Sequence, residues 1–238
     1  MSIKDQSKST SYQMFNRIAK TYDPVNRLLS FGLDIRWRKK VGTLLPKIEQ
    51  GVDLLDLATG TADQVLFLCD KHSSTINKAV GMDLSEGMLD VGREKIKSRN
   101  LQDKISLSVG DACALPIEND SFDAVTISFG IRNVPDVPKA LQEMYRILRP
   151  GGKALILEFA IPKNPIVRFG HLFYLRHVLP LVGGLISGER AAYRYLNTSI
   201  EAFPYGDDFA NLMTDAGFEK ANVHRVTFGI ANIYEGVK

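Results

Sequence analysis

The stretch 52–62, Val-Asp-Leu-Leu-Asp-Leu-Ala-Thr-Gly-Thr-Ala, constrains the fold of this chain more than any other. It starts as a short apolar run, ends in a turn of small residues, and is followed by a pattern typical of an amphipathic helix. A buried strand, a tight turn and a helix N-terminus form the first half of a nucleotide-binding βαβ unit. Gly60 has no Cβ, so the backbone can approach a ligand, and amides at the helix start can hold an anion.

The residues of this turn favour a ligand smaller than a dinucleotide. A dinucleotide-binding turn has the pattern G-x-G-x-x-G, whereas 58–62 contains a single glycine. Asp56 precedes the turn and would repel a pyrophosphate but attract an ammonium group. About 20 residues further on, a second strand ends at Asp83, where an acid can accept ribose hydroxyls. An amino acid joined to a nucleoside fits both places, which predicts S-adenosylmethionine as the cofactor; the alternative is an ordinary turn with two surface aspartates.

Length and composition indicate an ordinary globular protein. The 238 residues are 45% hydrophobic and 24% charged, and a net charge of +3 does not indicate nucleic acid as a partner. The only cysteines, Cys69 and Cys113, lack the spacing of a metal site, and we expect none. The polar residues 1–10 are expected to be mobile and are not a signal peptide, and no apolar run approaches the roughly 20 residues that span a bilayer. The simplest location is therefore the cytoplasm.

The order of the predicted elements defines the fold class. Strands and helices alternate through a helix capped by Ser85, a strand ending before Asp111 and Ala112, a strand at 122–128 that ends at Ser128, and a buried strand at 154–159. This alternation predicts a Rossmann-like, doubly wound, mostly parallel α/β sheet. We expect one domain over 1–238, made of an N-terminal helical cap (1–50), a cofactor-binding core (51–160), a substrate-lid insertion (161–203), and a closing helix and strands (204–238).

Two signatures resemble those of the quinone-biosynthesis C-methyltransferases, which act on ubiquinone and menaquinone precursors. The first is Tyr22-Asp23-x-x-Asn26-x-x-Leu29-Ser30, with Trp37 following, and the second is Arg-Ile-Leu-Arg-Pro-Gly-Gly at 146–152, ending in Ile-Leu-Glu at 156–158. The resemblance covers nearly the whole chain. This chain departs from the family pattern where Asp34 replaces the usual histidine, and its turn at 58–62 is poorer in glycine.

The resemblance implies a seven-stranded class I methyltransferase with N-terminal helices and a helical insertion before the last two strands. It implies methylation of a ring carbon of a polyprenylated quinol, demethylmenaquinol first and a ubiquinone-precursor benzoquinol second. It also implies cofactor contacts, which together with the residues of the turn make the predicted cofactor site Asp56, Gly60, Thr61, Asp83, Asp111, Ala112 and Ser128. In this site Asp83 would hold the ribose and Asp111 would accept from the adenine amino group.

The chemistry of such a reaction points to Arg132 and Asn133 as catalytic residues. A ring carbon is a weak nucleophile until a ring hydroxyl ionises, and ionising a phenol at pH 7 costs roughly 4 kcal/mol. An arginine is a poor proton acceptor, so we assign Arg132 to stabilising the phenolate and Asn133 to orienting the same oxygen. The alternative for Arg132 is a structural ion pair. Weaker candidates are Tyr22, Asn26, Asp34, His171 and Tyr195.

The stretch 161–203 interrupts the alternation and is apolar and aromatic, with Arg168, His171, Arg176 and His177 interleaved. This composition predicts either a surface that contacts the inner face of a membrane or a lid packed on the sheet, and a lid can also wall a channel for the prenyl tail.

The sequence leaves open whether the protein forms a homodimer. Other activities are a methyltransferase of another small molecule or of nucleic acid, a nicotinamide-dependent oxidoreductase, and a binding module without catalysis. The apolar insertion fits a lipid better than a phosphate backbone.

Overall fold

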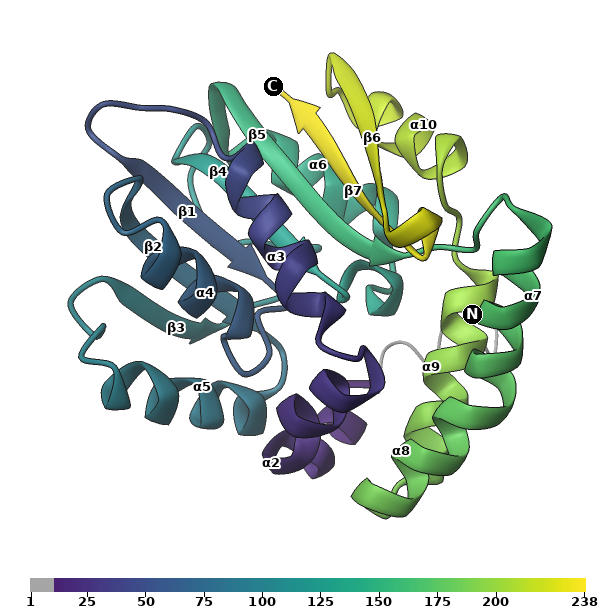
Figure 1. Ribbon diagram of the computed structural model, residues 1–238. Coiled ribbons are helices and arrows are strands. Elements are labelled where there is room, and N and C mark those ends of the chain that lie inside the picture. Colours follow the sequence, from purple (N-terminus) through teal and green to yellow (C-terminus); the bar gives the residue numbers. More distant parts are fainter. Residues whose placement is uncertain (1–10) are drawn as a thin grey trace.

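A seven-stranded sheet of order β3-β2-β1-β4-β5-β7-β6 forms the centre of the computed structural model, which describes residues 11–238 (Figure 1). The predicted mobility of residues 1–10 lies outside the described residues. Neighbouring strands run parallel except at β7, which is antiparallel to both of its neighbours. The strands are β1 (Val52–Leu57), β2 (Ile76–Asp83), β3 (Ile105–Val109), β4 (Phe122–Ser128), β5 (Leu148–Phe159), β6 (Lys220–Val226) and β7 (Ala231–Val237). The predicted mostly parallel, Rossmann-like sheet is confirmed.

The strand order places a topological switch between β1 and β4. From β1 the chain moves outward to β2 and β3, and it then returns to the other side of β1 to form β4 and β5. In open α/β sheets such a point leaves a crevice at the carboxyl ends of the strands, where ligands bind. The residues that end β1, β2, β3 and β4 are therefore brought to one edge, although they are far apart in the sequence.

Helices cover both faces of the sheet and enclose two hydrophobic cores. On one face α6 and α10 contribute Met144 and Phe209, and on the other α3 and α4 contribute Trp37 and Leu66. The covering helices are α3 (Leu33–Leu44), α4 (Asp63–Lys71), α5 (Glu86–Ser98), α6 (Val137–Ile147) and α10 (Asp207–Asp215). The predicted cap Ser85 accepts from the amide of Met88 at the start of α5, which satisfies one of the free amides there.

The N-terminal part forms a longer helix than the sequence indicated. The helical spacing of Met14, Phe15, Ile18 and Ala19 predicts only a short helix, and the residues from Tyr22 on are rich in polar and turn types, but α2 (Ser11–Leu29) continues through Pro24. Its buried residues Ile18, Val25 and Leu29 lie seven and four positions apart, on one helical face, and they pack in a third apolar cluster with the insertion. This packing favours the helix despite the proline. The chain then turns sharply at 30–32 into α3.

The insertion consists of α7 (Pro165–Phe173), the π-helical turn η2 (Tyr174–Val178), α8 (Leu179–Ser187) and α9 (Arg190–Ala202). Figure 1 shows these helices standing beside α2 at one end of the sheet. Leu175, Leu179 and Tyr193 from the insertion join Ile18 and Val25 of α2 in the third cluster. The insertion and α2 together therefore form a helical layer over the carboxyl edge of the sheet.

The expectation that no apolar run approaches the length of a membrane span is wrong. Within residues 11–238 the helical stretch Pro165–Ile186 is long and apolar enough to cross a membrane by length and composition, with a mean hydropathy of 1.2. The stretch is not recognisable as one apolar run in the sequence because Arg168 and Arg176 interrupt it. Only 28% of its most apolar window is buried inside the molecule, so much of its apolar surface is exposed. Length and composition alone do not make it a membrane span.

Candidate active site

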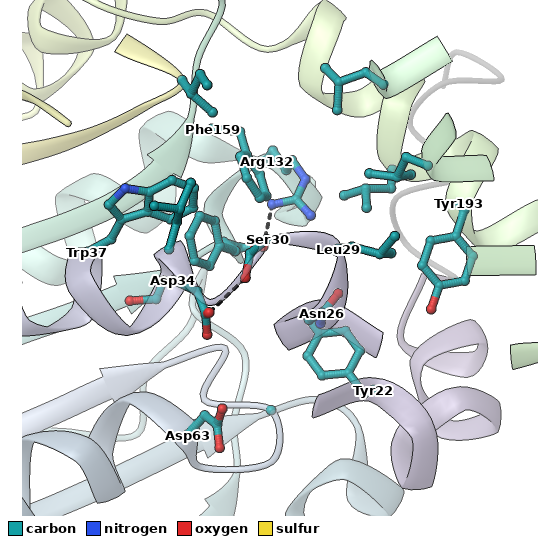
Figure 2. Close-up of a pocket in the computed structure, with 18 of the residues that line it drawn as sticks. Tyr22, Asn26, Leu29, Ser30, Asp34, Trp37, Asp63, Arg132, Phe159 and Tyr193 are labelled. Atoms are coloured by element: carbon teal, nitrogen blue, oxygen red, sulfur yellow. Dashed lines mark hydrogen bonds between the residues drawn. The ribbon is translucent and has the colours of Figure 1, made fainter. Parts of the chain in front are cut away.

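Two adjoining cavities lie along the carboxyl edge of the sheet. The large cavity, of about 400 Å³, is bounded by the ends of β1 and β4, by α2 and α3, and by the insertion (Figure 2). The small cavity, of about 230 Å³, reaches the ends of β2 and β3. Gly60, Ser128, Tyr22 and Phe129 line both cavities, so the two form one site that runs across the topological switch.

The turn after β1 adopts the strained conformation that a close ligand approach requires. Ala58, Gly60 and Ala62 all have positive φ, at 46°, 57° and 65°. Left-handed backbone costs non-glycine residues of the order of 1 kcal/mol each, and such strain clusters at binding sites. A Cβ at Gly60 would meet nothing within 4 Å, so the space above this residue opens into the cavities.

Asp56, at the end of β1, is buried and already accepts two hydrogen bonds. Thr126 donates to one carboxylate oxygen at 2.5 Å and Thr59 to the other at 2.6 Å. Burial raises the pKa of this carboxyl to about 6, although both hydroxyls favour the ionised form. An ammonium group bound in the large cavity, which Asp56 lines, would stabilise the ionised carboxylate.

Asp83 and Asp111 end β2 and β3 and line the small cavity. The Asp83 carboxylate accepts from the amides of Gly60 and Ser85, each at 2.8 Å, so it also fixes the strained turn. Burial raises the pKa of Asp83. A carboxylate has about four acceptor positions, which leaves capacity for ribose hydroxyls. Asp111 similarly accepts from the amide of Cys113 at 2.9 Å.

All seven residues of the predicted cofactor site line one or both cavities. Two of them use their hydroxyls elsewhere. Thr61 donates to Asp23 of α2 at 2.6 Å, and Ser128 donates to Gln64 at 3.1 Å. Thr61 therefore joins α2 to the turn, and because its hydroxyl proton is used it can offer a ligand only an acceptor oxygen, which Lys95 also contacts at 3.3 Å.

Arg132 lies on the short helix η1 (Ile131–Asn133) and is only 4% exposed, yet it lines the large cavity. Its Nη1 contacts Glu158 of β5 at 2.8 Å and the carbonyl of Phe129 at 2.5 Å, and its Nε donates to Ser199 at 3.3 Å. The buried ion pair that the sequence left as an alternative is thus present. Within residues 11–238 no hydrogen bond uses Nη2, so this nitrogen remains a donor for a ligand.

The other candidates divide between the cavities. Asn133 lines the small cavity, where its side-chain oxygen accepts from Tyr195 at 3.2 Å, so it is not beside Arg132 in the large cavity. The weaker candidates Tyr22, Asn26, Asp34, His171 and Tyr195 all line the large cavity. Figure 2 shows Tyr22 and Asn26 reaching it from α2, with Tyr193 farther off on the side of the insertion. Burial raises the pKa of Tyr22 and lowers that of His171.

Sequence reasoning missed Arg38 and Gln64. The basic run at 36–40 is typical of a solvated helix face, and Arg36, Lys39 and Lys40 are indeed exposed. Arg38 instead turns inward, lines the large cavity, and donates to Gln64 at 3.1 Å. The acid at Asp34, four residues before Arg38 and on the same helical face, was the available signal, because it indicates that the arginine has a partner within the protein.

The residues present fit an amino acid joined to a nucleoside. The acids of the small cavity suit ribose and adenine donors, the open turn at Gly60 lies between the cavities, and Asp56 suits an ammonium. Beyond Gly60 the large cavity is mostly aromatic and apolar, lined among others by Trp37, Phe129 and Phe159. This part is suited to a flat apolar ring close to the Arg132 guanidinium.

Comparison with known proteins agrees with this geometry. A demethylmenaquinone methyltransferase from Thermus thermophilus is 44% identical over 224 residues, which cover 94% of this chain and 99% of that protein. A ubiquinone/menaquinone biosynthesis C-methyltransferase from Geobacter sulfurreducens is 43% identical, with coverage of 94% and 87%. A SAM-dependent methyltransferase structure from Thermotoga maritima has the same fold, with a TM-score of 0.68, 19% identity and coverage of 95% and 99%. The model of the ubiE/COQ5 methyltransferase family matches residues 1–238, and the chain belongs to this family.

Proposed function

We propose that this chain is a C-methyltransferase that uses S-adenosylmethionine to methylate a ring carbon of a polyprenylated quinol, with demethylmenaquinol as the preferred substrate. The observation that carries the proposal is the buried guanidinium of Arg132 in the wall of an aromatic cavity that adjoins the cofactor turn. Relatives named for demethylmenaquinone methylation, 40–44% identical to this chain, support the same substrate class. A ubiquinone-precursor benzoquinol is the second substrate that the family supports.

Arg132 would act by stabilising negative charge on the quinol oxygen. The cofactor would supply an electrophilic methyl group. As the ring carbon bonds to it, the methyl–sulfur bond would break and release the neutral thioether, and the proton of that ring carbon would pass to water; the carbon is nucleophilic enough only when a ring hydroxyl is ionised. Glu158 and the Phe129 carbonyl fix the guanidinium through Nη1, which leaves Nη2 to donate to the oxygen. Because these donors are fixed before the substrate binds, they need no reorganisation as charge develops. The positioned guanidinium thereby offsets part of the roughly 4 kcal/mol that phenol ionisation costs at pH 7.

The prenyl tail of the bound quinol would extend from the ring into the space between α2 and the insertion. Ile18 and Leu29 of α2 line this part of the large cavity together with Leu175 and Leu179 of the insertion. Each buried CH₂ contributes about 0.8 kcal/mol, so a tail lying here would supply much of the binding free energy. We therefore propose that residues 161–203 are a substrate lid as well as a cover for the sheet edge.

The exposed face of the insertion supports contact with a membrane surface, from which a tailed quinol would be drawn. Ile166 and Phe169 on α7 are 83% and 75% exposed, and Leu185 on α8 is 68% exposed. An amphipathic helix with such a face binds at the boundary of headgroups and acyl chains. Arg176 is paired with Glu201, so apolar burial should contribute more than charge. We place the enzyme in the cytoplasm, peripheral to the inner membrane face; a homodimer remains a prediction.

An assay with two acceptors tests the proposal. The purified protein is incubated with S-adenosylmethionine and either demethylmenaquinol or its benzoquinol counterpart, and products are separated by liquid chromatography with mass detection. We expect a ring-methylated product from the naphthoquinol at the higher rate. No methylated product from either quinol would overturn the proposed activity and favour a binding module, and turnover dependent on a nicotinamide cofactor would favour an oxidoreductase.

A further inference from the structure

Two buried donors in the wall of the large cavity have no acceptor. Within residues 11–238, neither Nε of Arg38 nor Nε2 of Gln64 has a hydrogen-bond partner. Gln64 is only 2% exposed, and both residues line the cavity. A buried donor without a partner costs about 1–3 kcal/mol, and folded proteins retain few of them. Two such donors in one cavity wall indicate an acceptor that arrives with a ligand.

The two side chains are joined, and their orientation is fixed. Arg38 Nη1 and the Ser128 hydroxyl both donate to Oε1 of Gln64, each at 3.1 Å. Because Oε1 receives both bonds, the other amide atom of Gln64 must be the NH₂ group, which can only donate. The guanidinium of Arg38 lies 5.9 Å from the centre of the Phe129 ring, which further restricts it. The pair is therefore a preorganised set of donors from α3 and α4.

The surroundings favour an anion with two oxygen atoms. Gln64 lies in the first turn of α4, where the helix N-terminus attracts negative charge. Asp34 lies 3.9 Å from Arg38 Nε but is held more closely by Arg27 and by the Ser30 hydroxyl. Asp34 therefore does not satisfy Nε. Asp63 and Asp56 also interact with the Arg38 charge, but Asp63 is paired with Lys95 and Asp56 accepts from two threonine hydroxyls. The open space above Gly60 lies in the same cavity.

We infer that Arg38 and Gln64 bind the α-carboxylate of the methionine part of the cofactor. Asp56, in the wall of the same cavity, suits the ammonium of that amino acid, so the two charged groups of the ligand find partners of opposite character. The inference rests on the cofactor and not on the identity of the quinol. A failure of quinol methylation would leave the binding result below unaffected.

Calorimetric titration with two cofactor forms tests the inference. S-adenosylmethionine is compared with decarboxylated S-adenosylmethionine, which lacks only the carboxylate. Arg38→Met removes the guanidinium and keeps an apolar stem; Arg36→Met, on the exposed face of the same helix, is the matched control. We expect Arg38→Met to weaken S-adenosylmethionine about ten- to a hundredfold and to leave the decarboxylated form unchanged, because a charge-assisted bond is lost only with the first ligand. Arg36→Met should change neither affinity.

A second variant keeps the test decisive if Arg38→Met does not fold. Gln64→Glu retains the acceptor for Arg38 and Ser128 but places a negative charge beside the ligand carboxylate. It should weaken S-adenosylmethionine and strengthen the more cationic decarboxylated form, so the two affinities change in opposite directions. Changes in the same direction, or equal losses for both ligands in Arg38→Met, would overturn the inference and leave Arg38 and Gln64 with a structural role.

Discussion

Asp56 is deeply buried and lies beside the turn after β1, so its protonation should change the affinity for the cofactor. Burial raises its pKa to about 6, above the ordinary value of an aspartate. In the folded protein it therefore keeps a proton after the unfolded chain has lost its own, so ionising it destabilises the fold as pH rises from about 4 to about 6. A bound ammonium has the opposite preference, because it requires the ionised form.

We therefore expect the affinity for S-adenosylmethionine to fall as pH falls through 6. At pH 5, one unit below the pKa of about 6, binding should be about tenfold weaker than at pH 7.5, with proton release on binding. Calorimetry in two buffers of different ionisation enthalpy measures both effects. Asp56→Asn is the control, since it should remove the pH dependence near 6. An affinity that is constant from pH 5 to 7.5 in the unaltered protein would contradict the assignment.

Asp83 fixes the turn after β1 and is also the proposed ribose acceptor, so its removal should change both stability and binding. Asp83→Ala removes the acceptor proposed for the ribose and also the bonds to the Gly60 and Ser85 amides. We expect S-adenosylmethionine affinity to fall about ten- to a hundredfold, from the loss of roughly 1.5–3 kcal/mol in charge-assisted bonding. Denaturant unfolding should show lower stability as well. Unchanged affinity in the folded variant would exclude Asp83 from the cofactor site.

Arg132 requires a paired substitution. Arg132→Ala alone leaves Glu158 buried without its partner, which costs about 3–5 kcal/mol of folding stability. A loss of turnover in that variant could then come from unfolding as well as from lost catalysis. Arg132→Gln combined with Glu158→Gln removes both charges. We expect this double variant to bind S-adenosylmethionine nearly as well as the unaltered protein but to turn over about a hundredfold or more slowly. Raising pH should restore part of the rate as the free quinol ionises unaided. Near-normal turnover at neutral pH would refute the role of Arg132.

At the scale of elements, the exposed face of α7 is the part that can be tested separately from catalysis. Ile166→Asp with Phe169→Asp places two charges on this face. Neither residue lines a cavity; the residues of α7 that do are Val167, Gly170 and His171. We expect the variant to sediment far less with vesicles of anionic lipid while keeping its turnover on a short-tailed quinol in detergent. Val109→Asp, an exposed apolar residue on β3, is the control. Equal sedimentation of all three proteins would leave the insertion as an ordinary lid.

The elements that the sequence predicted well are those with local signals. Ser85 caps α5 as its residue type predicts, and β4 has the predicted bounds. The continuation of α2 through Pro24 was not predictable in this way, because the residues that favour it pack against an insertion about 150 positions later in the chain, a contact with no local signal. Arg38 is an intermediate case: Asp34 on the same helical face was a local signal that it has a partner within the protein, but Gln64, which it contacts, lies on another helix.

At the scale of the whole molecule, the sheet order explains why distant residues form one site. The alternation of strands and helices predicted the edge at which Asp56, Asp83, Asp111 and Ser128 gather. The sequence did not predict how the helical layer of α2 and the insertion divides that edge into a small cavity with two acids, Asp83 and Asp111, and a large aromatic cavity. That division depends on packing between segments far apart in the chain, and it places Asn133 in the small cavity, although it was expected to act with Arg132, which lines the large one.

The most direct test of the account is methyl transfer to quinols with and without a tail. The protein is supplied with S-adenosylmethionine carrying a deuterium-labelled methyl group and with demethylmenaquinol or its tailless counterpart, and labelled product is followed by mass spectrometry. The account predicts a label on a ring carbon of the tailed quinol and a much higher KM for the tailless one, because its ring alone buries little apolar surface. Label on oxygen, no labelled product, or equal kinetic constants for the two quinols would contradict it.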